Sequence, residues 1–351
     1  MRISMLGQSG SGKTTYMCAL HEAMIEDEFC GFSLAPYSGE LENSNSLVGI
    51  GKMEEISFLR DGENIQFPEG TTDTTYWTFD LLYRNKKLCE LDWIDYRGGK
   101  IDEIFHGDLE ADALKEIIYY SNAIMIFIDS IQLALNDEIG LCKRITGADK
   151  LTQLLKNYER LHKNEGTIIL IILSKCDSPL IVEEYKKNNY FNLISKCCIL
   201  FKDVLAIKSR NSNWRIGIVP VSSVGYGTVT SSKEQTKSVL KPYNVRCNLI
   251  KYPSPLNVAQ SFLFCVKEIL TFSKQLKRNE ISSIQNIVTK EFSRATSFYG
   301  ILTSLLRKGK PYARIRELLD EKEDIEIITQ RMDRIVNLID QTAQLEVIKV
   351  L

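Results

Sequence analysis

A glycine-rich loop near the start of the chain limits the possible folds more than any other stretch. Residues 7–14 follow the Walker A pattern Gly-x-x-x-x-Gly-Lys-Thr, directly after a short apolar segment at residues 3–6. From Lys13 onward, apolar residues recur at helical spacing as far as Met24. A strand, a glycine loop and a helix in this order predict a phosphate site, because loop N–H groups and the helix dipole both favour an anion.

Several side chains of this loop are candidates for binding a nucleotide. We expect Lys13 to reach the β- and γ-phosphates and the Thr14 hydroxyl to bind Mg²⁺. The other binding candidates in the loop are Gly7, Ser9, Gly10, Ser11, Gly12 and Thr15. The alternative is a glycine-rich turn with a chance lysine, and the flanking strand and helix argue against it.

Composition and cysteine usage argue against several classes of protein. Lys and Arg number 44 against 45 Asp and Glu, so no overall positive field predicts a nucleic-acid or anionic-membrane partner. The nine cysteines form no C-x-x-C pair and do not cluster with the three histidines, which favours reduced thiols in a cytoplasmic protein over a zinc site. We expect no signal peptide before the loop and no membrane span, since no apolar run approaches about 18 residues.

Strand-like and helix-like stretches alternate along the chain. Apolar and β-branched runs predict strands at residues 76–83, 88–94, 123–129, 167–173 and 214–221. Helices are expected at about residues 149–162, 180–208 and 255–276, the last after a polar loop with several lysines. Residues 30–70 are interpreted as an insertion, with one helical piece around Leu47, Met53, Ile56 and Leu59. This alternation predicts an α/β fold with a mostly parallel sheet, helices on both faces and one antiparallel hairpin.

Polar motifs accompany the predicted strands at the edge of the sheet where ligands bind in such folds. Threonines 71–75 precede the hairpin, and the motif Asp95-Tyr-Arg-Gly-Gly99 follows it. Asp95 is placed to hold Mg²⁺ through a water, and Gly98 lets the backbone approach a γ-phosphate. The next strands end in Ser174-Lys-Cys-Asp177 and in Ser222-Ser-Val224.

Together these motifs resemble the Ras-like GTPase family, a TRAFAC-class branch of the P-loop NTPases, over about residues 1–276. The resemblance implies a three-layer domain that binds GTP or GDP with Mg²⁺. Thr72 looks like the first-switch threonine that closes on the metal and the γ-phosphate, with Thr71 and Thr74 as alternatives. The resemblance therefore assigns Thr14, Thr72 and Asp95 to the metal.

Two further motifs carry the expected choice of base. Ser174-Lys175-Cys176-Asp177 is similar to the family's N/T-K-x-D motif, and Ser222-Ser223-Val224 to its S-A-K loop. In the family, the aspartate accepts hydrogen bonds from the ring N–H and exocyclic amine of guanine, which adenine does not offer. We expect Asp177 to read guanine and the Lys175 stem to lie against the base. Ser174, which replaces the usual Asn or Thr, can still bond to the phosphate loop.

The residue after Gly98 departs from the family pattern. Gly99 stands where Ras-like members usually carry a glutamine that orients the attacking water. Hydrolysis is therefore expected to be slow, to use a residue from elsewhere or to need a partner. Arg97 is a candidate for neutralising transition-state charge, and its alternative interpretation is a solvated loop arginine.

Residues 280–351 lie outside the resemblance, which leaves a GTPase-like domain at residues 1–277. Apolar residues at helical spacing from Ile281 to Leu305 and a heptad-like seam from Leu318 to Ile339 predict two helices. Lys308 to Pro311 separates them. We expect a helical hairpin that packs on the domain or on itself, or that contacts a protein partner or a second copy.

Three hypotheses for the function follow from these motifs. The first is a GTP-binding switch with slow hydrolysis, to which Lys13, Thr72, Arg97 and Gly98 contribute. The second is a nucleotide-binding scaffold that never hydrolyses its ligand, and Gly99 is the feature in its favour. The third is an ATPase, against which the aspartate of the N/T-K-x-D-like motif argues.

Overall fold

The structure is a computed structural model in which the chain forms two compact units. It describes residues 1–26, 29–36, 58–61, 64–68, 75–95, 118–161, 167–185, 188, 190–211, 213–237, 242–296, 310–345 and 348–350. One unit contains Met1–Cys265 together with Ala343–Leu351, and the other contains Val266–Thr342. The second unit thus begins within the helix that follows residue 257, and the C-terminal residues belong to the first unit.

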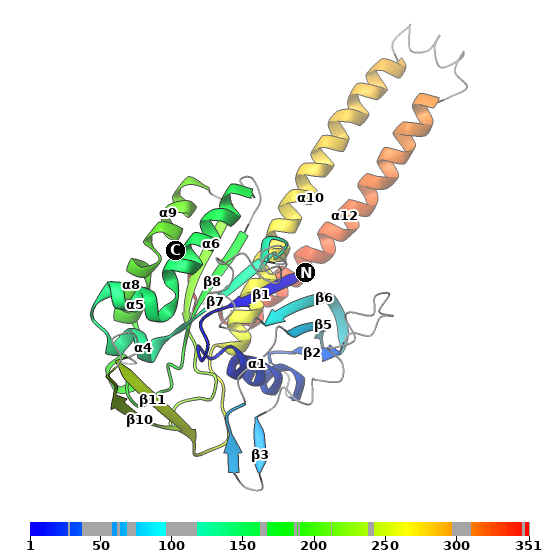
Figure 1. The fold of residues 1–351 in the computed structure, drawn as a ribbon. Coiled ribbons are helices and arrows are strands. Elements are labelled where there is room, and N and C mark those ends of the chain that lie inside the picture. Colours follow the sequence, from blue (N-terminus) through cyan, green and yellow to red (C-terminus); the bar gives the residue numbers. More distant parts are fainter. Residues whose placement is uncertain are drawn as a thin grey trace. The chain divides into compact units, whose positions relative to one another are not determined.

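An eight-stranded sheet forms the centre of the first unit, with the order β12-β9-β8-β7-β1-β6-β5-β2. Figure 1 labels the strands of this sheet from β8 to β2. Its strands are β1 (Arg2–Leu6), β2 (Phe32–Pro36), β5 (Thr75–Tyr83), β6 (Lys86–Asp95), β7 (Ala123–Asp129), β8 (Thr167–Ser174), β9 (Trp214–Pro220) and β12 (Lys349–Val350). The strands from β6 through β1, β7 and β8 to β9 pair in parallel. Among the described strands of this sheet, β5 on β6, β2 on β5 and β12 on β9 pair in antiparallel orientation. The predicted α/β fold is confirmed, and β2 and β12 extend it.

Helices pack on both faces of this sheet. They are α1 (Lys13–His21), its π-helical continuation η1 (Glu22–Glu26), α4 (Ser130–Leu135), α5 (Ile139–Thr146), α6 (Ala148–Leu161), α7 (Val182–Tyr185), α8 (Phe191–Leu200), α9 (Lys202–Arg210) and the start of α10 (Val258–Thr296). Because strand side chains alternate, Ile124 and Ile126 of β7 join one buried core with residues of α4, α5, α6, α8 and α9. On the opposite face, Tyr16 of α1 meets Phe127 of β7 edge-on with ring centroids 5.1 Å apart.

Two segments of the first unit differ from the sequence-based expectation. Residues 229–249, expected to be a polar loop before the last helix, contain an antiparallel pair, β10 (Val229–Gln235) and β11 (Tyr243–Leu249). In the expected insertion, Leu59 belongs to strand β3 (Leu59–Asp61), which pairs with β4 (Asn64–Gln66), and not to a helix. The other residues of that helical piece, Leu47, Met53 and Ile56, lie outside the described residues.

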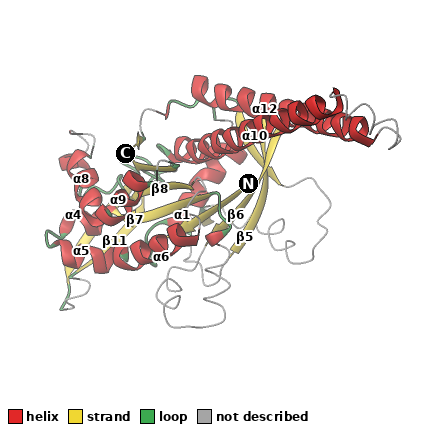
Figure 2. Ribbon diagram, turned by 90° about the horizontal axis from the view of Figure 1, so that it is seen from above, coloured by secondary structure: helices red, strands yellow, loops and turns green. Residues whose placement is uncertain are grey.

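The second unit consists of α10 beyond Cys265 and of α12 (Lys310–Thr342), which lie side by side (Figures 1 and 2). Salt bridges join the two helices, Lys267–Asp340 at 2.5 Å and Lys274–Asp333 at 2.6 Å. The expected separate helices at 255–276 and from 281 form one continuous helix, because no Gly or Pro interrupts the residues between them. Residues 297–309, including Leu305 and the expected break at Lys308, lie outside the described residues.

The C-terminal residues close one edge of the sheet in the first unit. Lys349 and Val350 of β12 pair with Ile218 and Gly217 of β9. Ile348, just before β12, is buried at 5% exposure. Residues 348–350 therefore contribute to the first unit through the β12–β9 pairing and the buried Ile348 side chain. None of the described helices combines the length and hydrophobicity needed to cross a bilayer.

Candidate functional site

The Walker A loop at residues 7–14 adopts a backbone geometry that requires glycine at two positions. The loop leaves β1 after Leu6, and α1 begins at Lys13. Gly12 has a φ of 92°, in the left-handed region that side chains rarely adopt. A Cβ on Gly7 would stand 2.7 Å from the carbonyl oxygen of Phe127 in β7, so only glycine lets the loop start this close to the sheet.

Lys13 is folded back under the same loop. Its Nζ donates hydrogen bonds to the carbonyl oxygens of Gly7 at 2.9 Å and Gln8 at 3.3 Å. Lys13 is buried at 5% exposure, so water screens its positive charge only weakly and the charge acts strongly on groups near the loop. This arrangement places a cation beneath the site where the loop N–H groups would receive a phosphate chain.

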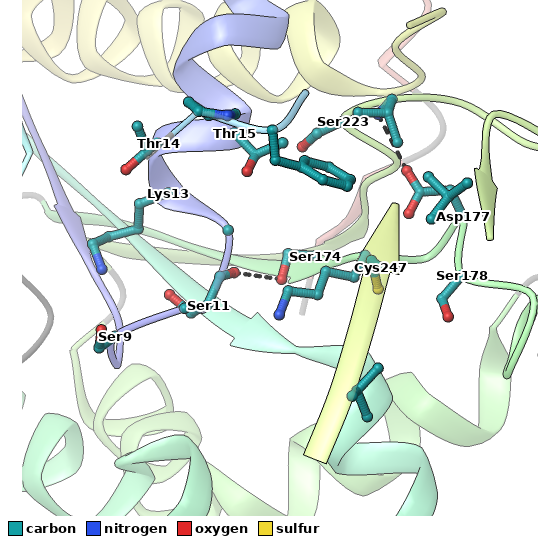
Figure 3. Close-up of a pocket in the computed structure, with 18 residues that line it drawn as sticks. Ser9, Ser11, Lys13, Thr14, Thr15, Ser174, Asp177, Ser178, Ser223 and Cys247 are labelled. Atoms are coloured by element: carbon teal, nitrogen blue, oxygen red, sulfur yellow. Dashed lines mark hydrogen bonds between the residues drawn. The ribbon is translucent and has the colours of Figure 1, made fainter. Parts of the chain in front are cut away.

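A cavity of about 320 Å³ lies beside the loop and joins the predicted motifs (Figure 3). Its lining includes every residue from Ser9 in the loop to Thr15 in α1, and Ser174, Lys175 and Asp177 from the turn after β8. Ser223 and Val224, from the loop after β9, complete the set of predicted residues that line it. Three motifs that are far apart in sequence therefore face one cavity at the carboxyl ends of β1, β8 and β9, where ligands bind in open α/β sheets.

Ser174 ties two of these motifs together. Its hydroxyl donates to the carbonyl oxygen of Ser11 in the loop at 2.6 Å, a contact drawn in Figure 3, and lies 3.0 Å from the carbonyl oxygen of Ile128. Ser174 is fully buried, so these bonds are not exchanged for bonds to water. The replacement of Asn or Thr by serine thus keeps the expected bond to the phosphate loop.

Asp129, which belongs to none of the predicted motifs, fixes the Lys175 side chain at the wall of the cavity. The Nζ of Lys175 lies 2.6 Å from Oδ2 of Asp129, the last residue of β7. Burial disfavours the charged form of Lys175, but the Asp129 carboxylate outweighs it and raises the pKa of the ammonium. Oδ1 of Asp129 accepts the N–H groups of Ile131 and Gln132 as the N-cap of α4, which fixes the carboxylate.

Asp177 presents a buried carboxylate to the same cavity (Figure 3). Its Oδ2 accepts hydrogen bonds from the Ser222 hydroxyl at 2.8 Å and the Val224 N–H at 3.2 Å. The Ser222 hydroxyl in turn accepts the N–H of Gly225 at 2.8 Å. Burial raises the pKa of Asp177, and the bonds from Ser222 and Val224 oppose that rise. The loop after β9 therefore orients the carboxylate, and Ser222 acts through Asp177 without lining the cavity.

Residues outside the predicted motifs complete the walls. Phe67 and Pro68, which follow β4, line the cavity, as do Val229, Val245 and Cys247 of β10 and β11. The alternation of Tyr243, Val245, Cys247 and Leu249 with polar residues is a period-two strand signal that could have revealed β11. The position of β11 beside the cavity depends on tertiary contacts and could not be predicted from the sequence.

Most of the predicted switch residues are not among those that the structure describes. Thr71, Thr72, Thr74, Arg97, Gly98 and Gly99 all lie outside the described residues. Asp95 is the last residue of β6, and its backbone pairs with Met5 of β1, the strand that leads into the Walker A loop. Only the backbone of Asp95 is described. Thr14 lines the cavity. A threonine hydroxyl and a strand-end carboxylate are oxygen donors of the kind that Mg²⁺ prefers, so the residues present suit that metal.

Comparison with known proteins identifies a family for the N-terminal part of the chain. A family model described as Double-GTPase 2 matches residues 1–198, which include the phosphate loop and the Ser174–Asp177 motif. No curated protein matches the chain. Among solved structures, one chain of the signal recognition particle receptor SRb-GTP/SRX complex from Chaetomium thermophilum is similar at 16% identity. The match covers 64% of this chain and 92% of that chain, with a TM-score of 0.36.

Proposed function

The chain belongs to the Double-GTPase 2 family, and we propose that it is a Mg²⁺-dependent GTP-binding switch with slow or partner-stimulated hydrolysis. The observation that carries the proposal is the buried Asp177 carboxylate in the same cavity as the phosphate loop. With Oδ2 bonded to Ser222 and Val224, the carboxylate can accept the ring N–H and amine of guanine. Adenine leaves that buried acceptor unpaired, which costs binding free energy.

The opposite end of the cavity would hold the phosphates. The loop N–H groups and the Lys13 ammonium supply positive charge, and Lys13 would exchange its bonds to loop carbonyls for phosphate oxygens. Mg²⁺, held by Thr14, Thr72 and Asp95, would neutralise further phosphate charge when bound. Lys175, fixed by Asp129, would lay its stem against the base.

The switch itself would be the residues that reach the γ-phosphate. Thr72 and the Gly98 N–H would order around GTP and relax after hydrolysis, and Arg97 would stabilise the transition state. A protein partner or a second copy would bind the α10–α12 pair. A cytoplasmic location is supported by the cysteines, all nine of which lie in the described part of the chain without a disulfide.

Guanine selectivity is the property that tests this proposal. Labelled GDP, GTP, ADP and ATP would be titrated against the purified protein, with Asp177→Ala alongside. We expect guanine nucleotides to bind at least about a hundredfold more tightly than adenine nucleotides, and the variant to lose most of that difference, because two bonds to a charged group are lost. Asp149→Ala, at an exposed ion pair with Lys143, is the matched control. Equal affinity for ADP and GDP in the unmodified protein would contradict the proposal.

Hydrolysis by the isolated chain should be well below about one turnover per second, as in switch GTPases without a partner. The reason is Gly99, which offers no side chain to orient water. A single-turnover assay with GTP measures the rate. Fast hydrolysis would mean that another residue positions the water, with Arg97 as the first candidate. No hydrolysis even after addition of cell extract would favour the scaffold hypothesis.

A further inference from the structure

The β10–β11 hairpin has one inner face and one solvent face. Its strands pair in antiparallel register from Val229 opposite Leu249 to Gln235 opposite Tyr243. Residues directly opposite each other share a face, and the next pair along points the other way. The inner face carries Val229, Ser231, Val245 and Cys247, and the exposed face carries Thr230, Ser232, Arg246 and Asn248.

The inner face is attached to the turn that carries Asp177. The hydroxyl of Ser178, the next residue, donates to the Ser231 hydroxyl at 3.1 Å. Ser231 also lies 3.3 Å from the Cys247 sulfur on the opposite strand. At the base of the hairpin, the N–H of Ile250 donates to the carbonyl oxygen of Thr228 at 2.9 Å. The hairpin is therefore anchored beside the residue proposed to read the base.

The same face forms an apolar wall of the cavity. Val229, Val245 and Cys247 line it together with Lys175 and Asp177. Burial raises the pKa of the Cys247 thiol, so this side chain stays neutral and contributes apolar surface. A planar base bound between the Lys175 stem and this wall would be shielded from water, and its binding would be stabilised in proportion to the apolar area that the wall covers.

We propose that the β10–β11 hairpin is a cover for the nucleobase, and that Val245 and Cys247 on its inner face set how slowly bound GDP leaves. The inference rests on the proposed guanine-nucleotide site. On this proposal the base would leave when the inner face separates from the Ser178 turn, because the hairpin lines that side of the cavity and is bonded to the turn.

The rate of GDP release tests this proposal. Ribose-labelled GDP would be displaced by excess unlabelled GDP in a stopped-flow instrument, for the unmodified chain and for a Val245→Ala, Cys247→Ala double variant. We expect the double variant to release GDP about tenfold faster, because the apolar groups that cover the base are removed. Arg246→Ala and Asn248→Ala, on the exposed face of the same strand, are matched controls and should stay within about twofold.

A second variant removes the cover altogether. Residues 229–249 would be replaced by a short glycine linker between Thr228 and Ile250, which the backbone hydrogen bond already holds together. Release should be faster still than in the double variant. If both variants release GDP at the unmodified rate while keeping guanine selectivity, the cover is refuted and the proposed function stands. If the unmodified chain binds no guanine nucleotide, both proposals fall.

Alkylation of Cys247 gives a readout that does not depend on any variant. Iodoacetamide labelling, resolved by residue with mass spectrometry, would be measured with and without saturating GDP. We expect GDP to protect Cys247, and the exposed Cys30 to be labelled equally in both samples. Equal labelling of Cys247 with and without GDP would show that the bound base does not lie under the hairpin.

Discussion

Lys13 and Asp177 place opposite charges in one cavity, and neighbouring groups hold each of them in position. Two loop carbonyls bind the Lys13 ammonium, whereas Ser222 and the Val224 N–H bind the Asp177 carboxylate. The Asp177 carboxylate is therefore oriented before a ligand arrives, which reduces the entropy lost on binding, whereas Lys13 waits at the loop and would exchange its carbonyl bonds for phosphate oxygens. On this account the positive end of the cavity recognises phosphate and the negative end recognises the base.

Removal of the Lys13 charge should abolish most triphosphate binding. We expect Lys13→Ala, or chelation of Mg²⁺, to weaken GTP binding by about a hundredfold or more, because the phosphate charges are then incompletely neutralised. Lys156→Ala is the control, since Lys156 forms an exposed surface pair with Asp203 at 2.7 Å and should change affinity by less than about twofold. Titration of fluorescent GTP measures both variants. Unchanged affinity after both treatments would mean that the loop is not the site.

The site residues differ in how far the sequence could reveal them. Lys13, Ser174 and Asp177 stand in motifs with fixed spacing, so their place in the cavity could be predicted from the residues alone. Asp129 could not be assigned a role, because its partner Lys175 directly follows the neighbouring strand β8 and only the pairing of Asp129 with Ser174 in the β7–β8 register brings the two side chains together. Spacing along the chain carries no information about such contacts between strands.

At the scale of elements, the short strand β12 joins the end of the chain to β9. Ile348 is buried at 5% exposure, and its Cγ2 would lie 3.1 Å from a Cβ placed on Gly217. β12 has only two residues and therefore shows no periodicity, which explains why the sequence did not predict it. The central strands β7 and β8, by contrast, are long apolar runs, and the predicted β7 matches the observed one at both ends.

Loss of the Ile348 side chain should destabilise the first unit. Ile348→Ala is expected to lower the free energy of unfolding by about 2–3 kcal/mol, because it leaves a cavity against the sheet. Val350→Ala, an exposed aliphatic residue two positions later, should cost less than about 0.5 kcal/mol. Gly217→Ala should also destabilise, because its Cβ would stand 3.0 Å from Leu170 Cδ1 as well as 3.1 Å from Ile348 Cγ2, and the added cost should be smaller beside Ile348→Ala, which removes one of these two contacts. Urea unfolding measures the four variants against the unmodified chain, and equal stability of the Ile348 and Val350 variants would contradict this role for β12.

At the scale of the molecule, the α10–α12 pair leaves the first unit and the chain then returns to it. Truncation after Lys277 would remove β12 as well as the helices, so it could not separate their effects. The cleaner change joins Ile284 to Glu326 through a short glycine-serine linker. This keeps the salt bridge of Lys274 with Asp333 and the strand β12.

We expect this shortened chain to bind GDP within about twofold of the full chain, because no residue beyond Cys247 lines the cavity among those described. Its oligomeric state or its capture of a partner should change if the helices serve that purpose. Nucleotide titration and light scattering after size-exclusion chromatography measure the two properties. A shortened chain that remains folded by circular dichroism but no longer binds GDP would show that the helices belong to the site.

The most direct test of the central claim is an exchange of base preference at Asp177. In Asp177→Asn, the amide oxygen can keep the bonds from Ser222 and Val224, so the amide N–H₂ group faces the base. That donor opposes the amine of guanine but pairs with the C2 carbonyl of xanthine. Competition between GDP and xanthosine diphosphate should therefore favour GDP in the unmodified protein and xanthosine diphosphate in the variant. The same preference in both proteins would contradict the assignment of Asp177 as the residue that reads guanine.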